Sequence, residues 1–429
     1  MTNIHPITFK KAINDIIIGG CSLTELAATY NTPLYIIDEA TIIKNCQLFT
    51  HLLSEHYPNF CIAYASKAGL NIGLSNLMAS NGIGADVVSG GELYTVLNSN
   101  VDRNQIYFHG NNKSKEELAL AIDHGIRLVV DNADELHNIS RIAQEKNKKA
   151  LLMFRIKPGI EAHTHEYIKT GHIDSKFGLP FNEALPLIQA TSCSDWGDFI
   201  GIHAHIGSQI FDTTPYMDLV AILVNFIKTI QEDLNVSVKE VNCGGGFGVS
   251  YTKNDQAPDV SDIILAMANE LKLLCDANRL PHPKLIFEPG RSIIAQAGVT
   301  LYTVGAVKPI ANHEPYVFVD GGMADNPRPM MYQSEYTFDI VAPSSDHRDT
   351  YTIAGKFCES GDILAKHVEL PLVEKNQLLV VYGTGAYNYS MSSNYNRFCK
   401  PAMVAVHNGA PRILVKRESY KDIIQYDAV

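Results

Sequence analysis

Lys67 is the residue in this chain with the clearest chemical potential, because it follows an apolar, β-branched and aromatic run at residues 60–64. Such a run predicts a buried strand, and a lysine at its end is held by a rigid element and partly desolvated. Desolvation lowers the pKa of an ammonium group, and the neutral amine can form an imine with a carbonyl group. A lysine lying along the surface is the ordinary alternative, so its chemistry depends on what gathers around it.

Most of the other apolar runs that predict strands also end in an ionisable or glycine-rich cluster. These clusters are Asp86, His109, Asp131, Arg155, His205, the glycine run 244–246 and the segment 288–291. If the strands form one parallel barrel, their carboxyl ends meet on a single rim, which is where barrel enzymes place their active sites. The pattern therefore predicts that Lys67 and these clusters share one functional site.

Two of the clusters favour a phosphate-bearing ligand. The glycines at 244–246 leave backbone N–H groups open to phosphate oxygens, and Arg291 can add a bidentate contact. A tight turn would explain the glycines alone, but loops after the seventh and eighth strands are the usual phosphate site of such barrels. Pyridoxal 5′-phosphate satisfies both needs, since its aldehyde can react with Lys67. Glu288 would then keep its pyridine nitrogen protonated, and His205 would stack on its ring.

A barrel metal hydrolase is the competing interpretation of the same rim. The H-x-H pairs at 163–165 and 203–205 could share a metal with Lys67 and Asp131. The first pair lies in a predicted loop rather than on a strand, and a metal site leaves the glycine run and Arg291 unexplained. We therefore expect no metal centre.

The elements that must position these residues form two blocks along the chain. Eight predicted strands alternate with helices, and they lie near residues 60–64, 85–89, 106–109, 128–131, 151–156, 200–206, 238–243 and 284–288. This count and spacing predict an α/β fold with a (β/α)8 TIM-type barrel over residues 38–298. A doubly wound open sheet is the alternative, although it more often stops at five or six strands.

After residue 298 predicted strands follow one another directly, and Asn408-Gly409 between two apolar runs is a hairpin signal. We expect residues 299–429 to form an all-β barrel or sandwich domain. The N-terminal segment 1–37 should hold a short helix and a strand, and that strand can join the sheet of the β domain.

The composition excludes several classes of partner. The net charge is −11 and the sequence pI is about 5.8, so no basic field would attract nucleic acid or an anionic membrane. No apolar run is long enough to span a bilayer, and the N-terminus lacks the signature of a signal peptide. The eight cysteines contain no C-x-x-C pair, which favours reduced thiols in a cytoplasmic protein.

Taken together, the motifs resemble the pyridoxal-phosphate-dependent decarboxylases of the alanine racemase fold, and among these the diaminopimelate decarboxylases. In the barrel the matching motifs are YASKA at 64–68, GADVVSGGEL at 84–93, TGHIDSKFG at 170–178, HAHIGSQ at 203–209, GGG at 244–246 and EPGR at 288–291. In the β domain they are RPMMY at 328–332, CESGD at 358–362, GAY at 385–387 and YN at 395–396. The motifs cover almost the whole chain in the expected order.

The resemblance implies decarboxylation of meso-2,6-diaminopimelate to L-lysine and CO2, the last step of lysine biosynthesis, by a homodimer with shared active sites. The predicted cofactor-binding residues are Lys67, Asp86, Arg155, His205, Ser208, Gly245, Gly246, Glu288, Gly290, Arg291 and Tyr387. The implied catalytic residues are Lys67, which bonds to the cofactor as an imine, His205, and Cys358. Either Cys358, reaching the other subunit's cofactor, or a water would protonate the substrate α-carbon. In this reading the β domain contributes substrate-binding and dimer-interface residues.

Substrate choice depends on the β domain. The implied substrate-binding residues are Arg291, Arg328, Tyr332, Glu359 and Tyr387. The substrate carries a distal carboxylate, for which Arg328 is suited, and a distal ammonium, for which Glu359 is suited; a dimer-interface ion pair is the alternative for Arg328. Other open alternatives are a decarboxylase of this fold for another amino acid, in siderophore, antibiotic or polyamine pathways, an amino-acid racemase, and a non-catalytic homologue.

Overall fold

The computed structural model describes residues 4–160 and 176–428. The chain divides into two compact units. The barrel unit comprises Asn45–Gly248 and Ala257–Ser292, and the β unit comprises Met1–Lys44, Val249–Gln256 and Ile293–Val429.

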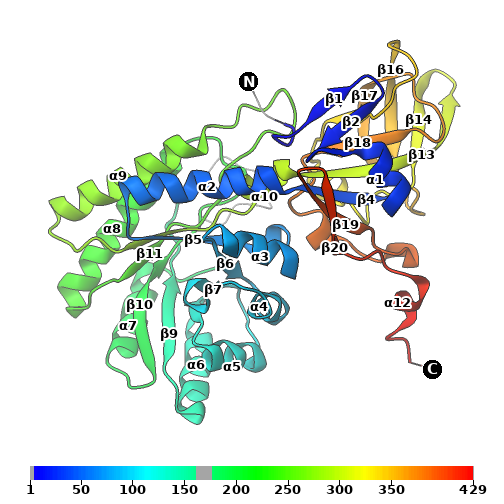
Figure 1. The fold of residues 1–429 in the computed structure, drawn as a ribbon. Helices are drawn as coiled ribbons and strands as arrows, with labels where there is room; N and C mark the ends of the chain where they lie inside the picture. The colour runs from blue at the N-terminus through cyan, green and yellow to red at the C-terminus, as the bar shows by residue number, and fades with distance from the viewer. Residues whose placement is uncertain (1–3, 161–175, 429) are drawn as a thin grey trace. The chain divides into compact units, whose positions relative to one another are not determined.

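The barrel unit contains eight parallel strands that close on themselves (Figure 1). The strands are β5 (Phe60–Ala65), β6 (Gly84–Val87), β7 (Ile106–Phe108), β8 (Arg127–Val130), β9 (Ala150–Arg155), β10 (Gly197–His203), β11 (Glu240–Asn242) and β12 (Lys284–Phe287). Closure comes from β12 and β5, which pair in parallel with Leu285 opposite Phe60. The predicted (β/α)8 barrel is confirmed, and the open-sheet alternative is wrong because the sheet has no free edge.

Helices follow most of these strands and lie outside the barrel (Figure 1). The helices and 3-10 turns of this part of the chain are α2 (Glu39–His56), η1 (Ser66–Ala68), α3 (Ile72–Ser80), α4 (Gly90–Leu97), η2 (Arg103–Gln105), α5 (Lys115–His124), α6 (Ala133–Lys146), α7 (Phe181–Ser192), α8 (Thr214–Leu234), α9 (Val260–Ala277) and α10 (Arg291–Ile294). A capping box opens α5, since Ser114 and Glu117 each accept a hydrogen bond from the other's backbone N–H.

The barrel interior has an apolar core and a polar end. Its core cluster is Cys61, Ala63, Tyr107, Val129, Met153, Ile200 and Ile286. Arg127 and Glu240, where β8 and β11 begin, form an ion pair of 2.9 Å, and the Tyr107 hydroxyl donates to Glu240. The amino-terminal end of the barrel is thus held by paired charges, while the carboxyl ends of the strands carry the residues described below.

The β unit is built on a nine-stranded sheet. Its strands are β4 (Leu34–Asp38), β13 (Gly298–Ile310), β14 (His313–Val319), β15 (Phe338–Ile340), β16 (Arg348–Ala354), β17 (Ile363–Pro371), β18 (Leu378–Tyr382), β19 (Ala402–His407) and β20 (Ala410–Val415). The N-terminal strand β4 lies between β13 and β19, as predicted. Asn408-Gly409 connects β19 to β20 as the expected hairpin, with His407 opposite Ala410.

Smaller elements complete the β unit. They are β1 (Lys10–Ala12), β2 (Asp15–Ile18), β3 (Cys21–Ser22), α1 (Leu23–Tyr30), η4 (Ala295–Ala297), α11 (Arg328–Tyr332), η5 (Tyr389–Met391), η6 (Tyr395–Arg397) and α12 (Tyr420–Ile424). One apolar cluster joins side chains of β2 and α1 to β4, β13, β18 and β19. The N-terminal segment therefore belongs to the core of this unit.

Two parts of the β unit were not predicted from the sequence. The N-terminal segment 1–37 was expected to hold a short helix and a strand, which are α1 and β4, but the three-stranded sheet β1–β3 that precedes them was not predicted. Strand β17 was missed because it is an end strand of the sheet in which only three of nine residues are buried, and His367 within it has a positive φ of 56°. Such a strand carries little of the apolar alternation that signals a half-buried element. Among the described residues, no helix is both long enough and apolar enough to cross a membrane.

Candidate active site

Lys67 lies at the carboxyl end of β5, where the 3-10 turn η1 begins directly after the strand. The Lys67 Nζ donates to Asp86 Oδ2 at 3.1 Å. The Lys67 side chain is 43% exposed, whereas Asp86 on β6 is fully buried. A lysine whose ammonium group contacts a buried carboxylate, and whose side chain is still partly exposed, can be oriented by the protein and reach a ligand.

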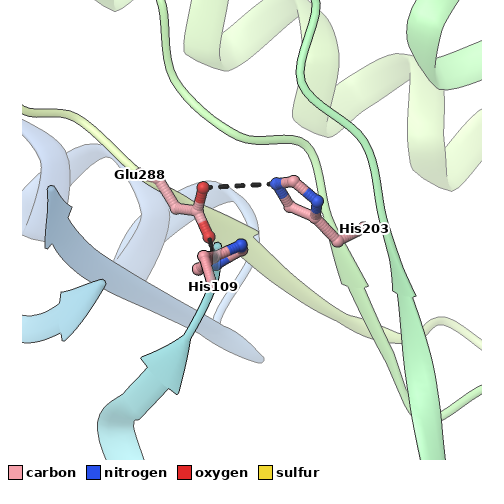
Figure 2. A group of neighbouring side chains, drawn as sticks. All are labelled: His109, His203 and Glu288. Carbon is pink, nitrogen blue, oxygen red and sulfur yellow. Dashed lines mark ion pairs between the residues drawn. The ribbon is translucent and has the colours of Figure 1, made fainter. Parts of the chain in front are cut away.

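Glu288 is the centre of a buried polar cluster at the same rim (Figure 2). Its Oε1 lies 2.5 Å from His109 Nε2, and its Oε2 lies 3.3 Å from His203 Nε2. Asn242, the last residue of β11, donates to Glu288 Oε1 at 2.5 Å. Burial by itself raises the pKa of Glu288, but the imidazoles of His109 and His203 outweigh it and hold that pKa well below its usual range. Glu288 is therefore an ionised acceptor.

His205 and His203 are both neutral rings at physiological pH. Burial lowers the pKa of His203 to about 3, although Glu288 acts in the opposite direction. Burial by the surrounding chain lowers the pKa of the His205 imidazole well below the ordinary value, and the positive charges of Lys67 and Arg155 lower it further. The His205 side chain is nevertheless partly exposed. Gly245 N donates to His205 Nδ1 at 3.3 Å, which places the ring hydrogen on Nε2. A neutral, fixed ring is suited to stacking on a planar ligand.

The loops after β10, β11 and β12 meet backbone against backbone. Gly246 has a φ of +95°, and a Cβ there would lie 2.3 Å from the carbonyl oxygen of Gly207. A Cβ on Gly245 would lie 2.1 Å from the carbonyl oxygen of Glu288. Only glycine fits at these positions, which leaves a side-chain-free cradle of the kind that phosphate needs. Beside it, Arg291 donates to Ser208 Oγ at 3.1 Å.

Arg155 and Asp131 support the rim on its other side. The Arg155 guanidinium lies 4.4 Å from the centre of the Phe177 ring, and Asp131 Oδ1 accepts a hydrogen bond of 2.8 Å from Gly178 N. Both contacts hold the segment that contains Phe177 and Gly178. The sequence-based interpretation placed Arg155 and Asp131 at strand ends but did not anticipate their contacts with this segment.

The predicted substrate residues of the β unit form a second group. The Arg328 guanidinium, on a side chain that is nearly buried, lies 5.2 Å from the Tyr332 ring centre and 5.5 Å from that of Tyr387. Tyr387 adopts a φ of +61°, a conformation that costs a non-glycine residue energy and is found most often at functional sites. Glu359 is exposed on a neighbouring loop, where its Oε1 accepts from Gly361 N.

Cys358 is exposed, and its backbone N donates to Asn396 Oδ1 at 2.8 Å. Its loop is fixed by Asp362, which is 2% exposed. Asp362 Oδ2 accepts from Phe357 N at 2.9 Å, and Asp362 Oδ1 accepts from Met323 N at 2.7 Å. One carboxylate thus ties the Cys358–Glu359 loop to the segment that leads into Arg328. The sequence analysis did not single out Asp362.

Several residues of the metal interpretation can now be placed. His163, His165 and the motif residues 170–175 lie outside the described residues. His203 and His205 do not act as a pair, because His203 contacts Glu288 whereas His205 contacts the glycine loop. The His109–Glu288 separation of 2.5 Å is that of a direct contact, and shorter than the roughly 3 Å between two ligands of one tetrahedral zinc.

The sequence analysis missed part of the Glu288 cluster. Asn242 was read as the end of a strand, His109 as one rim residue without a partner, and His203 only as a metal-ligand candidate. A polar residue at the last position of a strand was the available signal for Asn242 and His203. Lys113, which forms a buried 2.8 Å ion pair with Glu135, carried no comparable signal.

Fold and site define a class: a barrel protein whose rim combines an accessible lysine, a glycine phosphate cradle and an ionised buried carboxylate. Residues 39–295 match the family described as pyridoxal-dependent decarboxylase, pyridoxal binding domain. Diaminopimelate decarboxylase from Synechocystis sp. is 42% identical over 100% of this chain and 93% of its own length, and that from Bacillus subtilis is 40% identical over 99% and 98%. The solved structure of diaminopimelate decarboxylase from M. jannaschii has a TM-score of 0.93 at 34% identity, covering 99% and 98% of the two chains.

This chain belongs to the diaminopimelate decarboxylases, a family of pyridoxal-dependent decarboxylases. Its cofactor is pyridoxal 5′-phosphate. The rim fits that group, because a lysine, a phosphate cradle, a neutral imidazole and an ionised carboxylate are all present there.

Proposed function

We propose that this protein decarboxylates meso-2,6-diaminopimelate to L-lysine and CO2, the last step of lysine biosynthesis. The observation that carries the proposal is the similarity over essentially the full chain to proteins named diaminopimelate decarboxylase. A relative of known structure from M. jannaschii, 34% identical with a TM-score of 0.92, is described as a co-complex with L-lysine, the product expected here.

The barrel rim supplies the reaction centre. When bound, pyridoxal phosphate supplies an electron-accepting ring for the electron pair left behind as CO2 departs. Lys67 bonds covalently to the cofactor through its amine, and Asp86, 3.1 Å from that amine, orients it. Glu288 accepts the hydrogen of the pyridine nitrogen and so keeps that nitrogen protonated. His205 stacks on the ring.

The remaining cofactor contacts are assigned to the glycine cradle and its neighbours. Ser208, Gly245, Gly246, Gly290 and Arg291 hold the phosphate, where Arg291 adds positive charge, Gly246 and Gly290 add backbone N–H donors, and Gly245 leaves room for the ligand because it has no side chain. Arg155 and Tyr387 complete the assigned set.

The β unit supplies substrate recognition. Arg328 binds the distal carboxylate, because its guanidinium lies near the rings of Tyr332 and Tyr387 and keeps donors for a planar anion. Glu359 binds the distal ammonium. Arg291, Tyr332 and Tyr387 complete the substrate contacts.

Cys358 protonates the substrate α-carbon, with water as the alternative donor. The active unit is a cytoplasmic homodimer in which the Cys358 loop of one subunit serves the site of the other. In this arrangement the cofactor binds to the barrel, residues 38–298. The β domain, residues 1–37 and 299–429, contributes substrate-binding and dimer-interface residues. The membership of the family supports these assignments.

The direct test incubates the protein with pyridoxal phosphate and meso-2,6-diaminopimelate and measures L-lysine and CO2. Stoichiometric release of both is expected from the parent protein, and no turnover from Lys67→Ala. Lys115→Ala is the matched control, because Lys115 is exposed at the start of α5 away from the strand ends, and it should retain full activity. Absence of lysine from the parent reaction would refute the proposal.

A second experiment separates this activity from decarboxylation of another amino acid. Arg328→Gln should lower kcat/KM for meso-2,6-diaminopimelate by roughly a hundredfold, because a charged hydrogen-bond partner of a carboxylate is lost. Arg348→Gln, at an exposed position of β16, should change nothing. Unchanged turnover in Arg328→Gln would favour a substrate without the distal carboxylate. A lysine/ornithine decarboxylase with 21% identity shares the fold alone and does not favour that outcome.

A further inference from the structure

We propose that His109 is a positioning residue for the cofactor: it joins Glu288 to Asp86 and thereby keeps Glu288 able to accept the hydrogen of the pyridine nitrogen. The inference rests on the role of Glu288 in the proposed function. It assigns a role to a residue that the sequence placed at the predicted rim but did not assign to the cofactor or the substrate.

His109 contacts both buried carboxylates of the rim, Glu288 and Asp86, and Figure 2 shows its contact with Glu288. Its Nε2 lies 2.5 Å from Glu288 Oε1 and 3.7 Å from Asp86 Oδ1. Asp86 is fully buried, and the side chains of His109 and Glu288 are 4% and 5% exposed. Water therefore cannot replace the imidazole as the neighbour of either carboxylate.

The backbone fixes the His109 ring in this position. His109 N donates to Val87 O at 2.8 Å, which continues the β6–β7 pairing beyond the end of β7. The following residue, Gly110, has a φ of +100°, and a Cβ there would lie 3.0 Å from the carbonyl oxygen of Val88. The ring itself packs edge-on against His203, with centres 4.5 Å apart. The first two contacts fix the backbone at residues 109 and 110, and the third packs against the ring.

The chemistry of the contact requires a hydrogen on Nε2. Ionised carboxylate oxygens only accept hydrogen bonds, so an imidazole nitrogen that faces two of them must carry the hydrogen. The contacts are ion-pair contacts and not aligned hydrogen bonds in the described structure, which makes the effect mainly electrostatic. An imidazole N–H that faces both Glu288 and Asp86 offsets the repulsion between the two carboxyl groups.

His109 thereby completes a continuous polar array across the rim. Lys67 contacts one oxygen of Asp86, His109 lies between Asp86 and Glu288, and Asn242 donates to Glu288. Without His109, the Oε1 atom of Glu288 loses its contact with the imidazole N–H group. The carboxyl group would then take up a proton and could no longer accept one from the pyridine nitrogen.

The experiment is 15N NMR of the holoenzyme loaded with pyridoxal phosphate labelled at the pyridine nitrogen, together with the cofactor dissociation constant. His109→Phe, which has no N–H donor, should shift the 15N signal from the protonated to the neutral pyridine position and weaken cofactor binding by at least about tenfold. His109→Gln keeps a donor of similar reach and should retain much of the protonated signal. If His109→Phe does not fold, His109→Met serves as the donor-free variant.

Two reference variants separate the possible failures. Glu288→Gln must shift the signal to the neutral position; if it does not, the role of Glu288 in the proposed function is wrong. His137→Gln, at an exposed position of α6, must leave the signal unchanged. A protonated signal and parent-like affinity in the donor-free His109 variants, while Glu288→Gln shifts the signal, would overturn the inference and leave the proposed function intact.

Discussion

At the scale of single residues, burial and charge assign different states to groups of the same type. Glu288 and Glu92 are both largely buried carboxyl groups near the rim. Two imidazoles surround Glu288 and lower its pKa, whereas burial and the nearby Asp86 raise the pKa of Glu92 to about 7. The same side chain is thus an ionised acceptor at one position and a group poised to titrate near neutrality at the other.

Glu92 should make folding stability depend on pH in a defined direction. Its folded-state pKa of about 7 lies above the ordinary value of 4.5, so the folded state holds a proton that the unfolded state releases between these values. Stability should therefore fall as pH rises from about 4.5 to 7, by a few kcal/mol at most. Glu92→Gln, which preserves the acceptor for Val88 N, should remove this component.

Urea unfolding of the cofactor-loaded protein at pH 5 and pH 7 measures this effect. The loss between the two pH values should be smaller in Glu92→Gln than in the parent. Glu55→Gln, at an exposed position of α2, is the control and should behave as the parent does. Equal losses in all three proteins would contradict the assignment.

At the scale of elements, the site depends on how loops meet at the strand ends. The loops after β10, β11 and β12 approach so closely that glycines are required, and Asp362 holds two loops of the β unit together. The shape of the glycine loops and the position of the loops tied by Asp362 do not depend on which side chain contacts the ligand. Both depend on backbone groups that are placed by contacts between residues distant in sequence.

Gly246→Ala should abolish tight cofactor binding, because the new Cβ would lie 2.3 Å from the carbonyl oxygen of Gly207 and force the phosphate cradle open. Gly82→Ala is a closely matched control. Gly82 also has a positive φ, of +74°, but nothing lies within 4 Å of its Cβ position. It should cost only about 1 kcal/mol of stability and leave cofactor affinity unchanged. Equal cofactor affinity in both variants, measured by titration with pyridoxal phosphate, would show that the cradle is not the phosphate site.

Asp362→Ala should raise KM for the substrate by tenfold or more at unchanged cofactor affinity. Loss of the carboxylate leaves the backbone N–H groups of Met323 and Phe357 without their acceptor, and each such loss costs about 1–3 kcal/mol. Steady-state kinetics with a parallel cofactor titration separates the two effects. Asp349→Ala, exposed on β16, is the control. Weakened cofactor binding together with an unchanged KM would contradict the proposed division of labour.

At the scale of the whole molecule, the barrel unit carries all of the proposed cofactor residues except Tyr387, and the β unit carries most of the proposed substrate residues. The proposed homodimer explains why a cysteine as exposed as Cys358 can be assigned a chemical role, since its partner would be the site of the second subunit. Interfaces of this two-fold kind place the same residues in both sites.

Mixing two inactive variants tests the shared site. Lys67→Ala and Cys358→Ala should each be inactive or strongly impaired alone. After random subunit exchange, half of the dimers are mixed and each carries one intact site, so about a quarter of the parent activity should return. Recovery of none would place Lys67 and Cys358 of a single subunit in one site, or would mean that the protein is not a dimer. Analytical ultracentrifugation distinguishes these two outcomes.

The sequence by itself determined the barrel, the β sheet with its N-terminal strand, and the rim position of Lys67, His205, Glu288 and Arg291. These features depend on local patterns, since alternation of apolar runs with helical segments reports on strand order, and the carboxyl end of a strand is visible in the sequence. The resemblance to a family of decarboxylases, which the comparisons confirm, rested on short motifs in order.

Only the tertiary structure decided what surrounds Glu288 and Asp362. His109 and Asn242 contact Glu288 although they lie 179 and 46 positions away, and Met323 lies 39 positions from Asp362. Such pairs leave no periodic trace, because each partner is an ordinary polar residue at the end of a strand or in a loop. Their effect arises from burial at short range, where two imidazoles can lower the pKa of a carboxyl group that burial alone would raise.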